Sequence, residues 1–283
     1  MTDDPAAFWA ATAEFLTADP VLNSVVSTIV VKRATGEVVD AAPSTYVAVR
    51  DAAGPVVGVA VRTPPYVAVL TTMPAEAVAL VAAAMADAGH DLPGVSGPAD
   101  LARDFAELWC ADGHRSYEVT MAVRLHVLGE LTSPTGTPGR ARPASVADQA
   151  LLGTWSWAFR QESDPANGAD EESTRGDVAQ RIATGCAYVW LDDTGDGEEV
   201  VSYVGHSPLV AGVARVGPVY TPPERRGRGY ASGLVADVTR RLLDQGACDV
   251  CLNTDLANPT SNKIYARLGY EPLTDTTAYA FHP

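Results

Sequence analysis

The sequence has few basic residues, few cysteines and no long apolar run. Its 283 residues contain 20 lysines and arginines against 35 aspartates and glutamates, a formal charge of −15. A surface of this sign repels phosphate backbones, so no nucleic acid partner is expected, and a cationic small molecule such as an amine is favoured. The most apolar long stretch, residues 77–86, is far too short to cross a bilayer. We therefore expect no membrane partner.

The amino-terminal segment and the cysteines bear on the compartment. Residues 1–5 lack the basic and apolar regions of an export signal, so we expect a cytoplasmic protein. Four cysteines in a chain of this length do not make a disulfide framework. Cys248 and Cys251 form the one close pair in the sequence, and no second pair completes a zinc site. We expect both to be buried side chains and expect no metal.

Length and composition indicate a folded protein of about two domains. Hydrophobic residues make up 47% and charged residues 19% of the chain, as in soluble globular proteins. Residues 129–143 are rich in proline and glycine and show no hydrophobic period. We therefore predict an N-terminal domain over 1–128, a linker over 129–143 and a C-terminal domain over 144–283.

Hydrophobic periodicity predicts a related order of elements in the two halves. In each half, two helices precede a strand, an Asp/Gly turn, a second strand, a bend, a third strand and a long helix. This shared order favours a duplicated α+β fold. The predicted helices are 6–16, 21–31, 73–87, 98–111, 146–161, 170–184 and 232–245, and the predicted strands are 45–50, 56–62, 66–71, 117–128, 187–192, 200–205, 213–221 and 249–254.

The most informative segment is residues 211–272. Its first strand is interrupted by Gly217 and Pro218, and a proline inside a strand removes a ladder donor and is confined to edges or bulges. We therefore expect a bulge near Val219. Such a distortion separates neighbouring strands and frees backbone N–H groups to bind something other than a strand.

The loop that follows has the composition of an anion-binding site. It reads Pro-Pro-Glu-Arg-Arg-Gly-Arg-Gly-Tyr-Ala over residues 222–231 and leads into a helix. Its two glycines let consecutive N–H groups converge on oxygens, while the helix N-terminus and three arginines add positive charge. A diphosphate meets these requirements.

Two other nucleotide-binding loops fit this sequence poorly. A Walker loop needs glycine before lysine, and neither Lys32 nor Lys263 follows a glycine. A dinucleotide fingerprint places glycine directly after the strand, whereas here five residues separate the strand from Gly227.

The last predicted helix of the segment follows the strand 249–254. Asn258 stands before Pro259 as a good N-cap, and Gly269 is a good helix stop. A cap amide can also contact a ligand. Tyr265 lies two turns into this helix, where a tyrosine is either plain core or a residue that presents its hydroxyl to a site.

Together these residues make the second half resemble the GNAT superfamily of acetyl-CoA-dependent N-acetyltransferases. Arg226, Gly229 and Ala231 are similar to the family's pyrophosphate loop. The resemblance covers residues 140–283, and it implies a tandem of two GNAT-like domains, each a mixed, mostly antiparallel twisted sheet flanked by helices, with splayed strands at the CoA site of the second. The first domain has residues 71–74 (Thr-Thr-Met-Pro) where the loop belongs, so we expect a degenerate, non-catalytic copy.

The resemblance also implies roles for individual residues. Tyr265 is expected to be the general acid that protonates the departing CoA thiolate, since a phenol and a thiol have ordinary pKa values near ~10 and ~8.5. A backbone N–H near Val219 is expected to stabilise the thioester oxyanion. The expected acetyl-CoA contacts are Val219, Tyr220, Thr221, Arg226, Gly227, Arg228, Gly229, Tyr230, Ala231, Asn258 and Asn262.

The general base is less clear from the sequence. Many relatives carry a glutamate on the strand before the asparagine helix, but the corresponding residue here, Asn253, cannot accept a proton. The remaining candidates are Glu162, Asp164, His206 and Asp255.

The predicted function is transfer of an acetyl group from acetyl-CoA to the amino group of a small molecule in a direct ternary complex. The alternative is a non-catalytic sensor or scaffold that binds acyl-CoA, which the missing glutamate favours. Length and duplication also raise a third reading, a resemblance to the two-copy acetyltransferases that complete mycothiol. The sequence leaves the acceptor and the oligomeric state open, a homo-oligomer included.

Overall fold

The computed structural model describes residues 1–163, 170–193 and 197–283, and the chain divides into two compact units. Unit 1 contains Met1–Val123 and Thr274–Pro283, and unit 2 contains the described residues of 124–163 and 170–273. Strands β5 (Ser116–Leu128) and β11 (Tyr270–His282) therefore contribute residues to both units. The residues predicted to be a linker, 129–143, lie in unit 2.

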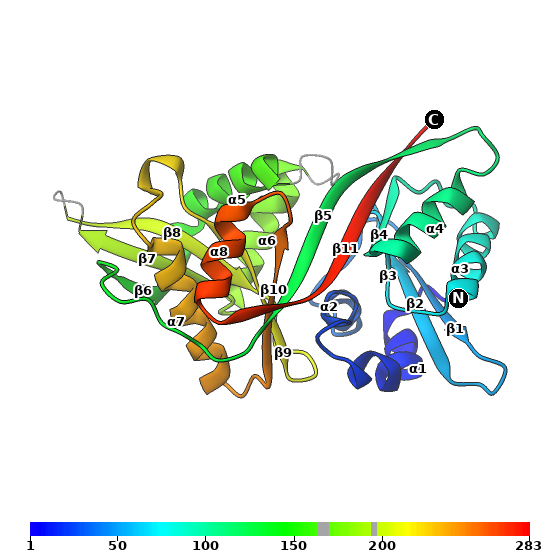
Figure 1. Ribbon diagram of the computed structural model, residues 1–283, viewed down its shortest axis with the longest axis horizontal. Helices are drawn as coiled ribbons and strands as arrows, with labels where there is room; N and C mark the ends of the chain where they lie inside the picture. Colours follow the sequence, from blue (N-terminus) through cyan, green and yellow to red (C-terminus); the bar gives the residue numbers. More distant parts are fainter. Residues whose placement is uncertain (164–169, 194–196) are drawn as a thin grey trace. The chain divides into compact units, whose positions relative to one another are not determined.

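Unit 1 is a sheet with a pair of helices on each face (Figure 1). Its strands follow the order β1-β2-β3-β4-β11-β5. The pairs β1–β2, β2–β3 and β4–β11 are antiparallel, and β3–β4 is parallel. Side chains of successive strand residues point to opposite faces of the sheet. Tyr46 therefore packs with α1 and α2, while Val47 packs with α3 and α4. The elements are α1 (Pro5–Ala18), α2 (Ser24–Ala34), β1 (Thr45–Arg50), β2 (Val56–Arg62), β3 (Ala68–Leu70), α3 (Ala75–Asp87), β4 (Gly94–Pro98) and α4 (Ala99–Trp109).

Unit 2 repeats this arrangement (Figure 1). Its strands run β10-β9-β8-β7-β6, with β9 and β10 parallel and the other pairs antiparallel. Val189 packs with α5 and α6, whereas Tyr188 and Trp190 pack with α7. The elements are β6 (Arg140–Pro143), η1 (Val146–Asp148), α5 (Gln149–Ser163), α6 (Glu171–Ala183), β7 (Ala187–Asp193), β8 (Glu198–His206), β9 (Val213–Tyr220), η2 (Pro223–Arg225), α7 (Tyr230–Asp244), β10 (Asp249–Asp255) and α8 (Pro259–Arg267).

These observations confirm the predicted fold class of two similar α+β units. The predicted strands 45–50 and 56–62 match β1 and β2 residue for residue, and the predicted helices differ from the observed ones by a few residues at their ends. The sequence analysis missed β4, β6 and β11. β4 contains two glycines and a proline and β6 is a four-residue strand that ends in proline, so both have low intrinsic strand preference and form because neighbouring strands pair with them.

Within the described residues, no helix is both long and apolar enough to cross a membrane. In the same ranges no group of three or more His, Cys, Asp and Glu side chains gathers as a metal site would require.

Candidate active site

The predicted bulge on β9 is present. Val204 of β8 pairs with Val219, but His206, two residues further along β8, pairs with Val216, three residues back along β9. The extra residue of β9 therefore lies at Gly217–Pro218, directly before Val219. Gly217 has φ of +147°, a backbone conformation that favours glycine.

The bulge coincides with the point where β9 and β10 stop pairing. The parallel register runs from Val213 and Asp249 to Val216 and Leu252 and ends there, although both strands continue for several residues. Backbone groups of successive strand residues point to opposite sides. Because Ser202 Oγ on β8 donates to the Tyr220 carbonyl (3.1 Å), Tyr220 faces β8 and the Val219 backbone faces the opening toward β10.

The loop after β9 brings glycines to the start of α7. Gly227 and Gly229 have φ of +80° and +83°, and Gly229 is the N-cap residue of α7. Gly229 has no side chain to cap this helix, so it leaves the first N–H groups of α7 without an acceptor of its own. Free N–H groups together with the positive end of the helix dipole make this loop suited to phosphate oxygens.

The three arginines of the loop have different surroundings. Arg226 donates from Nε to the Thr221 carbonyl (2.9 Å) and from Nη2 to Glu162 (2.7 Å), and its guanidinium lies 5.7 Å from the centre of the Tyr220 ring. Arg225 pairs with Glu199 at 2.5 Å. Among the described residues, Arg228 has no carboxylate partner. The sequence analysis counted the positive charge of all three and expected Arg226 and Arg228 to contact the ligand; in the described part of the chain, Arg228 is the one of the three without a carboxylate partner.

Tyr220 and Tyr230 differ in what their hydroxyls contact. The Tyr220 hydroxyl donates to Glu162 (3.2 Å), and its ring packs on Trp155 with centroids 6.1 Å apart. Tyr230 is buried, and its hydroxyl donates to the Asp192 carboxylate. Burial raises the pKa of both tyrosines. The Tyr230 hydroxyl also contacts the Arg228 side chain, so this buried tyrosine helps to hold an arginine of the loop.

The two predicted asparagines hold the start of α8. Asn258 caps the helix as predicted, its Oδ1 accepting from the Ser261 N–H (3.1 Å). Asn262 accepts from the Thr254 hydroxyl (2.5 Å) and donates to the carbonyls of Asp255 and Asn258. These contacts fix α8 to the end of β10, beside the point where β10 leaves β9.

Tyr265 lies on α8 with 8% of its surface exposed and packs edge-on against Tyr270, with ring centroids 6.1 Å apart. No hydrogen bond engages its hydroxyl within the described part of the chain. Burial raises the pKa of this phenol well above its ordinary value. The side chain therefore stays protonated at neutral pH and has a proton to give.

The candidate bases are dispersed. Glu162 is held by Arg226 and Tyr220, and Asp255 Oδ1 accepts from the Ala257 N–H (2.8 Å). His206 is buried, stacks on Tyr188 and contacts the Ser207 carbonyl through Nδ1 (2.8 Å). The Cys186 thiol is the other polar neighbour of the His206 ring. Asp164 lies outside the described residues, and Asn253 is exposed on β10.

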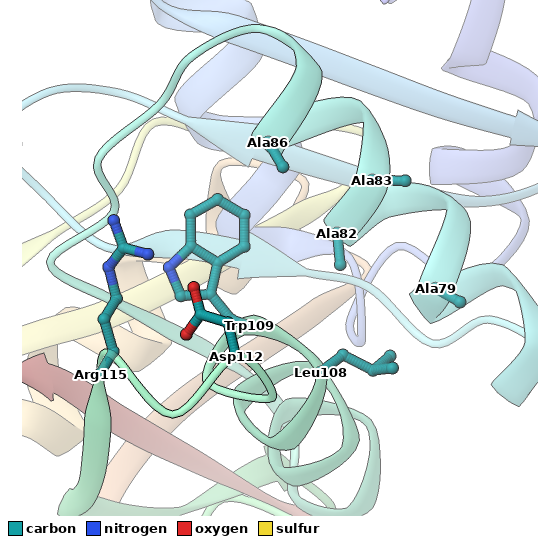
Figure 2. Close-up of a pocket in the computed structure, with 8 residues that line it drawn as sticks. All are labelled: Ala79, Ala82, Ala83, Ala86, Leu108, Trp109, Asp112 and Arg115. Carbon is teal, nitrogen blue, oxygen red and sulfur yellow. The ribbon is translucent and has the colours of Figure 1, made fainter.

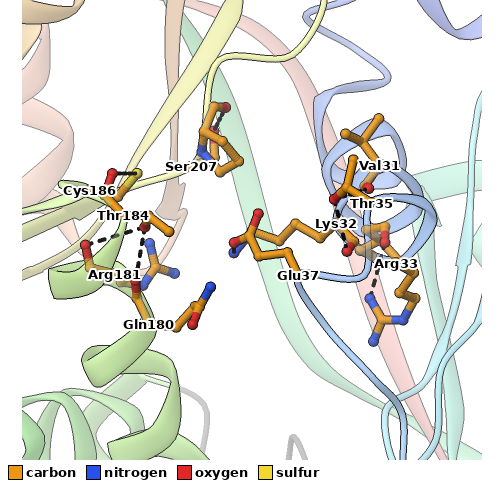
Figure 3. A network of polar contacts seen from close by, with 12 residues as sticks. Val31, Lys32, Arg33, Thr35, Glu37, Gln180, Arg181, Thr184, Cys186 and Ser207 are labelled. Atoms are coloured by element: carbon orange, nitrogen blue, oxygen red, sulfur yellow. Dashed lines mark hydrogen bonds and ion pairs between the residues drawn. The ribbon is translucent and has the colours of Figure 1, made fainter.

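The structure adds one residue that the sequence analysis missed, Arg181 of α6. Its Nη1 donates to the carbonyls of His206 (2.8 Å) and Gly217 (3.3 Å), so it bridges the end of β8 and the bulge. No local pattern in the sequence predicts this contact, because Arg181 ends an otherwise ordinary amphipathic helix. Cys186, next to it in Figure 3, is buried, and its Sγ lies 3.7 Å from the Thr184 carbonyl.

A separate pocket of about 310 Å³ lies in unit 1 between α3 and α4 (Figure 2). Alanine methyl groups form much of its wall, and the Arg115 guanidinium lies 6.0 Å from the Trp109 ring centre. It contains none of the predicted site residues.

The sequence and fold of this unit can be compared with those of known proteins. Residues 151–270 match the model of the acetyltransferase (GNAT) family. This region is similar to the acetyltransferases of the GNAT family. A curated relative, the mycothiol acetyltransferase of Kocuria rhizophila, is 29% identical over 160 residues, which are 50% of this chain and 48% of that protein. The match thus spans about half the length of this curated relative.

Solved structures extend the similarity to the whole fold. A GCN5-related N-acetyltransferase from Sphaerobacter thermophilus superposes with a TM-score of 0.61 at 15% identity, covering 89% of this chain and 85% of the other. A tandem GNAT protein from the clavulanic acid biosynthesis pathway gives a TM-score of 0.53 at 15% identity, covering 90% and 87%. At such identities the likeness concerns the fold, and it confirms the expected tandem GNAT architecture.

Proposed function

We propose that unit 2 is the catalytic domain of an N-acetyltransferase that moves the acetyl group of acetyl-CoA to the amino group of a small molecule in a direct ternary complex. The observation that carries the proposal is the separation of β9 and β10 beyond Val216 and Leu252, which leaves the Val219 backbone facing the opening. Pantetheine is an extended chain with amide groups, and it fits an opening lined by an unpaired strand edge.

The residues around the opening fit this substrate. The uncapped start of α7 with Gly227 and Gly229 suits the diphosphate, and Arg228 supplies a charge without a carboxylate partner among the described residues. Arg226 holds the loop in place by donating hydrogen bonds to the Thr221 carbonyl and to the Glu162 carboxylate. Asn258 and Asn262 act in this scheme by fixing α8, which carries Tyr265.

Acetyl-CoA supplies an activated acetyl thioester. The Val219 N–H stabilises the negative charge that develops on the carbonyl oxygen when the amine attacks, which forms the C–N bond. Tyr265 delivers its proton to the sulfur as the C–S bond breaks, and its raised pKa keeps that proton in place until then. The amine must lose a proton, and His206, Glu162 and Asp255 are the described groups that we propose to test as its acceptor.

The experiment is a thiol-release assay with acetyl-CoA and a panel of amines that includes the acceptor of mycothiol acetyltransferase. We expect free thiol only when an acceptor is present. Thiol release that never depends on an acceptor, in a protein that calorimetry shows to bind acetyl-CoA, contradicts the transferase. Alanine variants of the three candidate bases identify the base by the loss of one limb of the pH–rate profile.

A second function, an acyl-CoA sensor or scaffold, is favoured by Asn253, which cannot act as a base on β10. In that case acetyl-CoA raises the unfolding temperature, and no amine in the panel is acetylated. Absence of both binding and turnover contradicts both functions.

A further inference from the structure

Arg62, the last residue of β2 in unit 1, is a buried cation without a counter-charge. Its exposed fraction is 6%, and neither Nε nor Nη1 has a hydrogen-bond partner. Among the described residues no carboxylate forms an ion pair with it. Every other arginine at the ends of the inner strands of unit 1 or on its helices has a partner or faces solvent; Arg33, for example, pairs with Asp40 at 2.6 Å.

An unpaired buried charge is costly. Burial lowers the pKa of the Arg62 guanidinium, but a guanidinium remains protonated in proteins. Leaving such a cation uncompensated in a protein interior is strongly unfavourable, so buried charges are nearly always paired. A charge that the chain itself does not pair is suited to an anion from outside.

The neighbours of Arg62 provide further groups for an anion. Thr45 is its cross-strand partner on β1, so the two side chains lie on the same face of the sheet. The Thr45 hydroxyl is 2.8 Å from Nε2 of His90, in the connection between α3 and β4. On the other side the cross-strand partner is Ala68, whose methyl side chain has no polar atom to pair with the guanidinium.

We propose that Arg62, Thr45 and His90 form a binding site in unit 1 for a small oxyanion, a carboxylate or phosphate group. The guanidinium offers planar N–H donors to two oxygens, and the hydroxyl and the imidazole border the same space. The site lies at the start of β3, where Ala68 pairs with Arg62, whereas residues 71–74, which occupy the place of a pyrophosphate loop, follow the end of that strand. It is thus distinct from any CoA-like position in unit 1 and holds whether or not unit 2 is a transferase.

The test measures thermal unfolding of the full chain with increasing inorganic phosphate or acetate, against chloride at equal ionic strength. The variants are Arg62→Met, which removes the charge at similar volume, and the matched control Arg50→Met, which removes an exposed arginine of the same sheet that donates to the Gly54 carbonyl. Unit 2 is unchanged in both variants, so phosphate bound there contributes equally.

We expect saturable stabilisation of the wild type, by roughly 5 °C at an anion concentration near 100 times Kd. Arg50→Met should keep this response. Arg62→Met should lose the part of this response that exceeds the contribution of unit 2, while being at least as stable as the wild type in chloride, because an unpaired buried charge has been removed. If only one of the two anions stabilises the wild type, that result identifies the class of anion that the site binds.

Equal responses of the wild type and Arg62→Met, or no saturable response to either anion, overturn the proposal. If Arg62→Met does not fold, Arg62→Lys replaces it, since lysine keeps the charge but loses the planar donors. The proposal then requires an apparent Kd at least ~10-fold weaker than that of the wild type by calorimetry, and an unchanged Kd overturns it.

Discussion

The two units share one plan, yet the parallel pair of strands in each unit, β3–β4 and β9–β10, behaves differently. In unit 2, β9 and β10 part after Leu252, next to the bulge at Gly217–Pro218. In unit 1 the corresponding strands, β3 and β4, stay close: a Cβ built on Gly97 would lie 2.9 Å from Leu70 Cβ. The comparison teaches that the fold alone does not create the opening; a local distortion of one strand does.

The loop after β9 in unit 2 and the loop after β3 in unit 1 also differ, the first being open and the second closed by side chains. In unit 2 the loop ends in Gly229 with free N–H groups at the start of α7. In unit 1 the Thr71 hydroxyl bonds the backbone of Val59, Met73 is buried in the core, and Pro74, which has no N–H, precedes α3. These side chains close the region that is open in unit 2, which supports our proposal that unit 1 is a non-catalytic copy.

We expect the largest effect on turnover from Tyr265→Phe, which tests whether unit 2 is the catalytic unit. Loss of the hydroxyl removes the proposed general acid, so kcat should fall by about 10²–10⁴-fold while the Kd for acetyl-CoA changes little. Steady-state kinetics and calorimetry measure the two quantities. The matched control is Tyr270→Phe, a buried neighbour whose hydroxyl contacts Thr239 (2.6 Å) and which should keep its turnover. Unchanged kcat in Tyr265→Phe would remove the residue from the mechanism.

A charge reversal in each unit tests whether the loop of unit 2 binds the diphosphate of acetyl-CoA. Arg228→Glu places a carboxylate beside the proposed diphosphate site, and loss of a charge-assisted hydrogen bond is worth about 1.5–3 kcal/mol, so we expect acetyl-CoA affinity to fall by about 10- to 100-fold. Arg103→Glu on α4 of unit 1 is the control, because Arg103 is likewise exposed. Titration calorimetry gives the affinities, and equal affinities in the two variants would exclude the loop as the diphosphate site.

The close approach of β3 and β4 can be tested by Gly97→Ala. The added methyl group meets Leu70 on β3, so overpacking should lower the free energy of unfolding by about 2–3 kcal/mol. Gly176→Ala on α6 of unit 2 is the contrasting variant, because nothing lies within 4 Å of its added Cβ and alanine favours a helix. Urea unfolding compares them. A neutral Gly97→Ala would show that β3 and β4 can separate at little cost, as β9 and β10 do.

The aspartates at the starts of α1 and α5, Asp4 and Asp148, differ in burial, which predicts a different pH dependence of stability. Hydrogen bonds from Arg142 lower the pKa of Asp148, which is buried before α5, from 3.8 to about 2. Its contribution, roughly 2 kcal/mol, is present above the unfolded pKa and is lost as pH falls from about 4 through 2. Asp148→Asn should therefore be less stable at pH 7, and the difference should vanish near pH 2.

The control for this experiment is Asp4→Asn at the exposed cap of α1 in unit 1, which keeps an acceptor for the Ala6 N–H. Its effect should be within about 0.5 kcal/mol at every pH. A difference for Asp148→Asn that persists unchanged to pH 2 would contradict the ion-pair explanation.

Much of the fold could be read from local patterns. The alternation of β1 and β2, the cap at Asn258 and the glycine-rich start of α7 are properties of short segments, so the sequence alone predicts them. The partner of Arg226 could not be predicted, because Glu162 is 64 residues away and reaches it only when α5 packs on the sheet. Likewise Arg181 reaches Gly217 only through tertiary packing.

By itself, the sequence determined the order of elements, the resemblance of the second half to acetyltransferases and the residue types of its loop, since each depends on spacing within one segment. Tertiary structure decided which arginine of the loop after β9 lacks a carboxylate partner among the described residues. It also decided that β11 ends in unit 1 and that Tyr265 is buried and protonated. Charge pairing and burial depend on neighbours that the chain brings together from distant positions, so only the folded arrangement fixes them.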